Sequence, residues 1–354
     1  MFSKKLTVSG GLYVGEKATL TINYFSEANV IGGDVLLANG GVLTHAASTA
    51  GTEAAKLWLN VGGDVTIPQG CSINVKAKGF PTGKGTGFLG GTHGSSYASV
   101  GIRSDSSTTF ANPYGSILYP FNLGSGSNYS GGGAVRIAAT GDITINGTVD
   151  ASGQNSSYTA GTGGSIWLSG SNVSGSGTIN AKAGTHGGSH DRSSGGRIAI
   201  YRTGTEGWSG FNFTVTCGGR APGTYYREDS TGKGELRITE CTGSNNGTWL
   251  PMPNDGAARN AFRDVAVTVG ANCILCVKNA SLPTGSSVKI QDLHLSSSSS
   301  KVRCHGNFLR VLSKTHKNGN GWVSGNYATR ISNGSITLSD GAIVWSAGFS
   351  VSVR

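Results

Sequence analysis

The stretch that decides the fold is GGAVRIAATGDITINGTVDASG, which spans residues 132–153. It returns as GGSIWLSGSNVSGSGTINAKAG over residues 163–184, and a third, degraded copy starts at Gly195, so the copies begin 31 and 32 residues apart. Each copy holds two short alternating runs, a turn of Gly, Ser or Asn, and a polar glycine-rich excursion. A period of this size indicates a structural repeat whose units bury their apolar faces only against one another.

The alternation inside each repeat is typical of half-buried strands. Val135 and Ile137, for example, point to the same side of a strand, and the residues between them point to the other side. The crossover connection between two parallel strands of one sheet is right-handed almost without exception. We therefore predict an all-β fold, namely a single-stranded, right-handed parallel β-helix, or β-solenoid, with long glycine-rich loop excursions.

The spacing of the strand-like runs divides the chain into two parts. Residues 1–234 are predicted to form the glycine-rich β-helix, with repeats of about 31 residues. Beyond residue 234 strand-like runs continue at a shorter spacing. They predict further β-helix rungs and a C-terminal cap over residues 235–354, or alternatively a separate small β domain.

Two long excursions interrupt the repeats, over residues 80–131 and 183–197. The first is too long for an ordinary connection and too aromatic for a plain linker, and such excursions often carry binding sites. The alternative is that its aromatic side chains pack onto the flank of the solenoid. The phrase THGGSH at 185–190 echoes GGTHGSS at 90–96, which predicts that both excursions lie on the same side of the molecule. The candidate ligand-binding residues of the first excursion are His93, Arg103, Tyr114 and Tyr119.

The charge balance is basic, with 28 Lys and Arg against 18 Asp and Glu and a net charge of +10. A basic surface attracts acidic polysaccharide, nucleic acid or anionic lipid, or serves solubility alone. No nucleic-acid-binding motif accompanies the dense basic stretch at 301–317, so no specific nucleic acid partner is predicted. No run approaches ~20 apolar residues, so no transmembrane segment is expected, and the first residues lack the apolar core of a signal peptide.

The chain contains six cysteines: Cys71, Cys217, Cys241, Cys273, Cys276 and Cys304. The C-x-x-C pair at 273–276 invites a zinc or redox hypothesis, but the second pair that a zinc ribbon needs is missing. We therefore predict no metal site and no cofactor. Cys217 and Cys241 are separated by 24 residues and Cys276 and Cys304 by 28, close to one turn of the solenoid. These pairs either form disulfides or fill the core as small apolar residues.

The order of the glycine-rich phrases, from GGDVTI at 62–67 through GGTHG at 90–94 to GGRIAIY at 195–201, resembles a known family. It is similar to the glycine-rich repeat region of large bacterial surface or secreted proteins, which are abundant in planctomycete, verrucomicrobial and lentisphaeral bacteria. The resemblance covers roughly residues 32–240. It implies a secreted or cell-surface parallel β-helix and no settled biochemical activity.

The favoured function is a non-catalytic, secreted or cell-surface module that binds polysaccharide or a cell-surface glycan, or acts as a structural or adhesive spacer. Aromatic residues that can stack on sugar rings are Tyr114, Tyr119, Trp208, Tyr225 and Tyr226. The oligomeric state is open, and a trimer would favour a third hypothesis, a phage or appendage fibre segment.

The catalytic alternative is a polysaccharide lyase acting on acidic polysaccharide, which needs a cationic group and a base. β-Helices commonly host such enzymes, although this is an argument from fold alone. The candidate catalytic residues are His186, His190, Arg192, Arg197 and Tyr201. A glycoside hydrolase needs two carboxylates that face each other, and it is less favoured because acidic residues are scarce.

Overall fold

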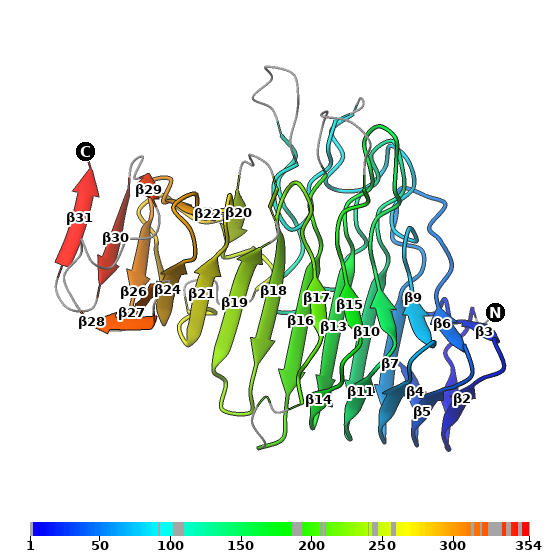
Figure 1. Cartoon of the computed structure of the whole chain (residues 1–354). Helices are drawn as coiled ribbons and strands as arrows, with labels where there is room; N and C mark the ends of the chain where they lie inside the picture. Colours follow the sequence, from blue (N-terminus) through cyan, green and yellow to red (C-terminus); the bar gives the residue numbers. More distant parts are fainter. Residues whose placement is uncertain are drawn as a thin grey trace.

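A computed structural model describes most of the chain. The described residues are 3–90, 93–101, 110–185, 193–205, 208, 210–239, 241–242, 247–255 and 260–312, and beyond 312 the backbone of five strands. Every regular element in these residues is a β-strand, and most strand pairs are parallel. The all-β, parallel-strand prediction is therefore confirmed, and the arrangement is compatible with a β-solenoid (Figure 1).

A ten-stranded sheet, which we call the shared sheet, runs along the molecule (Figure 1). Its strands in spatial order are β1 (Thr7–Val8), β4 (Asn29–Ile31), β7 (Leu57–Val61), β10 (Ala134–Ala139), β13 (Ser165–Gly170), β16 (Arg197–Arg202), β18 (Gly223–Glu228), β19 (Gly234–Thr239), β21 (Val265–Val269) and β24 (Asp292–Leu295). Neighbouring strands are parallel except β18 and β19, which form an antiparallel hairpin.

Two further parallel sheets accompany the first seven strands of the shared sheet. One consists of β2 (Leu12–Val14), β5 (Val35–Leu37), β8 (Val65–Ile67), β11 (Ile143–Ile145) and β14 (Val173–Ser174). The other consists of β3 (Thr19–Thr21), β6 (Val42–Thr44), β9 (Ser72–Asn74), β12 (Thr148–Asp150), β15 (Thr178–Asn180) and β17 (Thr214–Thr216). From β1 to β15 the chain visits the three sheets in turn, so each repeat adds one strand to each sheet. We call β1 to β18 the N-terminal unit.

The chain from β19 onward, the C-terminal unit, repeats this pattern. One sheet contains β20 (Thr248–Leu250), β22 (Ile274–Val277), β25 (Lys301–Arg303) and β29 (Ser335–Thr337). Another contains β23 (Ser287–Ile290), β26 (Phe308–Val311), β30 (Gly341–Trp345) and β31 (Phe349–Val353), and β27 (Thr315–Asn318) pairs with β28 (Gly321–Ser324). The succession β21, β22, β23 and then β24, β25, β26 again supplies one strand to each of three sheets.

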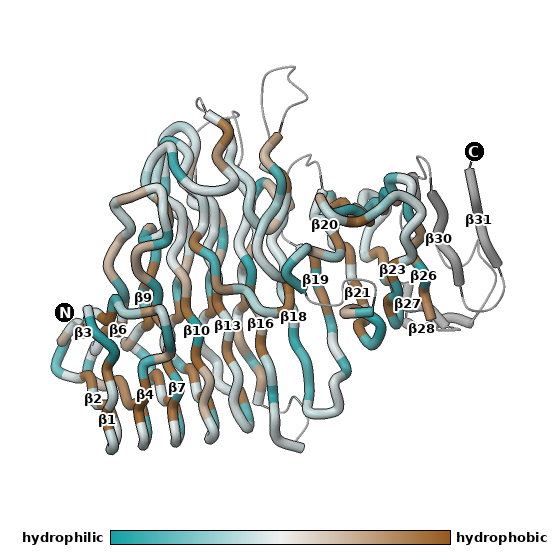
Figure 2. Tube along the Cα trace, turned by 180° about the vertical axis from the view of Figure 1, so that it is seen from behind, coloured by the Kyte–Doolittle hydropathy of each residue, from teal (hydrophilic) through white to brown (hydrophobic). Residues whose placement is uncertain are grey.

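The core of the N-terminal unit consists of apolar side chains stacked in register. Leu59, Ile137, Leu168 and Ile200 occupy one row across β7, β10, β13 and β16, and each is fully buried. The row lies inward because residues alternate between the two faces of a strand. Burial of each such side chain contributes about 1.5–3 kcal/mol. Figure 2 shows hydrophobic residues concentrated in the strands of both units.

The core changes to the other face of the shared sheet at the β18–β19 hairpin. The adjacent register row, which points away from the N-terminal core, consists of Trp167, Ala199, Tyr226, Leu236, Val267 and Leu293. These side chains belong to the buried cluster of the C-terminal unit. The strand direction reverses at the same place. The two units therefore pack their cores on opposite faces of one continuous sheet.

The glycine-rich excursions extend from the same side of the N-terminal unit (Figure 1) and hydrogen-bond to one another. Gly124 N–H donates to Gly132 O, and Gly132 N–H donates to Thr162 O, both at 2.9 Å. A Cβ at Gly132 would overlap the carbonyl oxygen of Ala151, so this backbone approach requires glycine. Ser194 N–H donates to Ser95 O at 2.9 Å, which confirms that the two long excursions lie on the same side.

The first excursion also closes the core of the C-terminal unit. Ile117 and Leu118 belong to the buried C-terminal cluster, together with Val100. The buried Asp255 carboxylate accepts hydrogen bonds from Ile117 N at 2.7 Å, from Leu118 N at 3.1 Å, and from the Ser116 hydroxyl at 2.5 Å. Burial of the carboxyl raises the pKa of Asp255 above its usual value. The excursion thus packs its apolar side chains against both units.

All six cysteines are buried and none forms a disulfide, so the structure contains the core-filling alternative. Cys71 and Cys217 belong to the N-terminal core cluster, and the other four belong to the C-terminal one. Cys241 Sγ contacts Arg220 O at 3.1 Å, and Cys241 hydrogen-bonds to Cys273 one coil further on. Burial raises the pKa of Cys276 to about 12. The Cys276 thiol is therefore protonated at neutral pH, and all six cysteine side chains pack within the apolar cores.

Candidate functional site

A cleft of about 400 Å³ opens where the core changes face. In the N-terminal unit the row of Ile137, Leu168 and Ile200 is buried core. The continuation of that row on β18, β19, β21 and β24 is Arg227, Glu235, Ala266 and Asp292. Because the C-terminal core lies on the opposite face, these side chains face away from it. They form the floor of the cleft, and the end of the N-terminal unit forms one wall.

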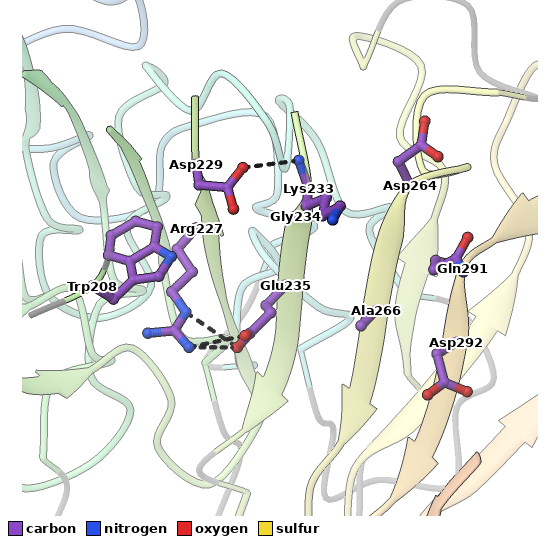
Figure 3. Close-up of a pocket in the computed structure, with 10 residues that line it drawn as sticks. All are labelled: Trp208, Arg227, Asp229, Lys233, Gly234, Glu235, Asp264, Ala266, Gln291 and Asp292. Atoms are coloured by element: carbon purple, nitrogen blue, oxygen red, sulfur yellow. Dashed lines mark hydrogen bonds and ion pairs between the residues drawn. The ribbon is translucent and has the colours of Figure 1, made fainter. Parts of the chain in front are cut away.

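Trp208, from the connection between β16 and β17, forms that wall beside Arg227 (Figure 3). Its ring packs edge-on against Phe211 at 5.3 Å between centroids, and the Arg227 guanidinium lies 5.0 Å from its centroid. Asp264 and Gln291 lie on the far side of the cleft (Figure 3). The indole is thus held in place by neighbouring side chains at the edge of a rigid sheet.

The β18–β19 hairpin supplies the central charged pair. Arg227 and Glu235 stand opposite each other in the antiparallel register, and the guanidinium Nε and Nη2 lie 3.1 and 2.9 Å from the carboxylate. Arg237 Nη2 approaches the same carboxylate at 3.5 Å. Burial raises the pKa of Glu235, but the hydrogen bonds and positive charge of the two arginines outweigh it and hold the pKa below its usual value.

The hairpin turn places Asp229 and Lys233 at the rim of the cleft. The Asp229 carboxylate accepts hydrogen bonds from the Thr231 hydroxyl at 2.6 Å and from the backbone N–H groups of Thr231 and Lys233 at 2.9 and 3.3 Å. The Thr231 hydroxyl bond is the main reason why the pKa of Asp229 lies below its usual value. Asp229 therefore fixes the turn in its ionised form.

The cleft is acidic although the chain as a whole is basic. Its acidic lining residues are Asp229, Glu235, Asp264 and Asp292, and its basic ones are Arg227 and Lys233. The excess of carboxylates repels anionic ligands and offers hydrogen-bond acceptors to hydroxyl or amino groups. Because the pKa values of Asp229 and Glu235 are lowered, these two carboxylates suit hydrogen-bond acceptance better than proton donation.

The sequence-predicted Arg197 lies on β16 and is fully buried outside this cleft. Its Nη2 donates to the carbonyl oxygens of Tyr97 at 3.2 Å and Tyr114 at 3.1 Å, and its Nη1 donates to Thr224 Oγ1 at 3.3 Å. Burial lowers the pKa of its guanidinium. The side chain holds the first excursion on the shared sheet.

The predicted tyrosines mostly serve the same attachment. Tyr114 and Tyr201 are half-buried, and their hydroxyls donate to Leu123 O and Leu118 O, each at 2.7 Å. Burial raises the pKa of both phenols. Tyr119 is 53% exposed, and its ring stacks on Tyr201 with centroids 5.9 Å apart. Of these three, Tyr119 is the most exposed.

The remaining predicted residues are less well placed. His93 is half-buried within the first excursion and does not line the cleft. Arg103, His186, His190 and Arg192 lie outside the described residues, so their candidate roles stay predictions. Sequence reasoning named Trp208 as a stacking residue but missed Arg227, Glu235 and Asp292, which line the same cleft. The signal that could have identified these residues is a change in the inward row, which is apolar up to Ile200 and charged at Arg227 and Glu235. This change is visible only when the strand register is known.

No group of three or more His, Cys, Asp and Glu side chains in the described part of the chain is arranged to hold a metal ion. The same residues contain no helix with the length and apolar character needed to cross a membrane. No protein-family model, curated protein or solved structure matches the chain.

Proposed function

We propose that the chain is a secreted or cell-surface module, built as a right-handed parallel β-helix, that binds carbohydrate without cleaving it. The β-helix is supported by the repeats, each of which adds one strand to each sheet. The right hand is supported by the crossovers between parallel strands, because such connections are right-handed. At the β18–β19 hairpin both the strand direction and the side of the core reverse, and these two changes together preserve the hand of the coil. The resemblance to bacterial surface proteins over residues 32–240 supports the location.

The single observation that carries the binding function is the cleft at the change of core. It combines an indole wall with carboxylate, guanidinium, ammonium and carboxamide groups on adjacent strands and in the residues directly beside them. Ligand sites typically pair an aromatic surface with a few well-placed polar groups. Strands hold such groups in fixed positions, so little conformational entropy is lost when a ligand binds. The carboxylate excess favours a neutral or amino-substituted glycan over a uronate polymer.

The lyase alternative rests on fewer groups than the sequence indicates. Arg197 and Tyr201 already donate to backbone carbonyls, and the raised pKa of Tyr201 keeps its phenol protonated at neutral pH. A lyase would therefore depend on His186, His190 and Arg192. If no glycan binds, the proposed function would instead be that of an adhesive or structural spacer.

The test is a glycan array of neutral, amino-substituted and acidic polysaccharides, followed by calorimetric titration of the best ligand. Trp208→Ala and Gln291→Ala alter opposite sides of the cleft, and Tyr13→Ala is the matched control because Tyr13 is 58% exposed on β2. We expect at least about tenfold weaker binding for each cleft variant, equivalent to about 1.4 kcal/mol, and unchanged binding for the control. Circular dichroism of each variant verifies its fold.

Three outcomes contradict the proposal. Wild-type affinity in both cleft variants would place carbohydrate binding elsewhere on the molecule. No binding to any glycan would leave the spacer as the best account. Ultraviolet absorbance of unsaturated sugar ends, lost on His186→Ala or His190→Ala, would establish the lyase.

A further inference from the structure

A second hollow, of about 270 Å³, lies between the first excursion and a corner of the C-terminal unit. Its lining includes Phe110 and Asn112 from the excursion and Trp249, Lys278 and His305 from the C-terminal unit. Lys278 follows β22 and His305 follows β25, each two residues beyond the register pair Cys276 and Arg303. Equivalent positions on neighbouring strands lie about 4.8 Å apart, so the two side chains start from adjacent points of one corner.

The charge of this hollow is opposite to that of the cleft. The Lys278 ammonium lies 5.2 Å from the centroid of the Trp249 ring, and none of the described residues that line the hollow is acidic. Among the described residues, no ion pair joins Lys278, Arg303 or His305 to a carboxylate. Unneutralised like charges at neighbouring positions cost free energy, and a bound anion removes that cost.

The backbone holds His305 in an uncommon conformation. Its φ is 51°, the following Gly306 has a φ of 75°, and Asn307 N–H closes the turn on Cys304 O at 3.0 Å. His is, with Asn and Asp, one of the side chains that adopt the left-handed region most readily, and a following glycine is typical of such a turn. The turn fixes the imidazole on the lining of the hollow.

Electrostatics at the imidazole agree with this geometry. Burial lowers the pKa of His305, and the positive charges of Lys278 and Arg303 lower it further. The three groups are therefore close enough to repel one another when charged. A ligand with negative charge would favour the protonated imidazole and gain an additional hydrogen-bond donor.

We propose that this hollow binds an anionic group, a carboxylate, sulfate or phosphate, through Lys278 and His305 above the Trp249 ring. The group is either a free inorganic anion or a substituent of an acidic glycan. The proposal goes beyond the cleft and does not depend on carbohydrate binding there, because an inorganic anion is sufficient to occupy the site.

The experiment titrates the full chain with sodium sulfate, sodium phosphate, a uronate oligosaccharide and a sulfated oligosaccharide, each against sodium chloride at equal ionic strength. Binding is measured by calorimetry. Lys278→Met keeps the aliphatic stem over Trp249, and His305→Asn tolerates the positive φ. Lys289→Met, which removes a partly exposed lysine of β23 outside the hollow, is the matched control.

We expect Lys278→Met to weaken anion binding at least about tenfold and His305→Asn several-fold, with no change in Lys289→Met. Binding of inorganic ions alone supports the site with a free anion as ligand, and binding of an oligosaccharide supports it with a glycan. A response to sulfate and phosphate no larger than to chloride, with no oligosaccharide bound, overturns the proposal. Equal affinity in Lys278→Met and Lys289→Met also overturns it. Failure of the Trp208 experiment leaves each of these outcomes unaffected.

Discussion

Single buried polar side chains attach the excursions to the sheets. His45 follows β6 and is fully buried. Its Nε2 accepts a hydrogen bond from Ala134 N–H at 3.2 Å, so its Nδ1 carries the proton and donates to Ala46 O at 2.7 Å. This neutral imidazole joins the end of one coil to the strand that begins after the first excursion. Like Arg197, it gives backbone groups a partner where no strand pairs with them.

The burial of His45 predicts acid sensitivity. Burial lowers its pKa to about 4, below the unfolded value of about 6.5, so the folded state binds fewer protons between these pH values. The stabilisation is complete above about pH 6.5 and is lost as the pH falls towards 4, and it amounts to about 3 kcal/mol. Urea unfolding at pH 7.5 and 4.5 measures it. His45→Gln should show a smaller difference between the two pH values than wild type, and an equal difference would refute this assignment.

Among the elements, the first excursion differs most from an ordinary loop. Its backbone hydrogen-bonds to neighbouring glycine-rich segments, and its apolar residues complete the core of a unit more than a hundred residues further along the chain. Ile117 is fully buried in that core, whereas Leu89 of the same excursion is 48% exposed. The excursion is thus a structural element of the C-terminal unit as well as a surface feature.

Ile117→Ala is expected to lower the free energy of unfolding by about 3 kcal/mol, through lost burial and the cavity left behind. Leu89→Ala should change it by no more than about 0.5 kcal/mol. Chemical denaturation measures both variants. Hydrogen exchange should also speed up in β21 and β22 for Ile117→Ala alone. Similar stabilities of the two variants would show that the excursion does not support the C-terminal core.

At the scale of the whole molecule, one continuous sheet separates two cores. The shared sheet buries Ile200 on one face and Leu236 on the other, and Trp167 and Tyr226 of the N-terminal unit contribute to the C-terminal core. The cleft exists because each core covers only its own part of the sheet. Neither end of the cleft would keep its geometry if the two units were separated.

This arrangement predicts that residues 235–354 do not fold alone. As a fragment they would lose the β18 partner strand and the covering residues Ile117 and Tyr226, which exposes a large part of their apolar cluster. The full chain should unfold in one calorimetric transition, and the fragment should give a circular dichroism spectrum of an unfolded chain. A folded fragment with its own cooperative transition would instead establish a separate small β domain.

The repeat period and the alternation within it were sufficient to predict the parallel strands of the N-terminal unit. Side chains such as Val135 and Ile137 alternate between faces, and this local geometry is the same in any sheet. Glycine pairs recur at the start of each repeat, and at Gly132 the lack of a side chain lets neighbouring segments approach closely. Both features depend on residues near one another in the sequence, which is why they are visible without a structure.

The cleft and the change of core face were decided by tertiary structure. Alternation shows which residues share a face of β18 or β19 but not which face is buried, because that depends on what packs against it. Arg227, Glu235 and Asp292 become neighbours only through the register of four strands, and Lys278 and His305 only through the stacking of successive coils. The sequence by itself therefore determined the strands and their repeat, and long-range packing determined the two cores and the binding surfaces between them.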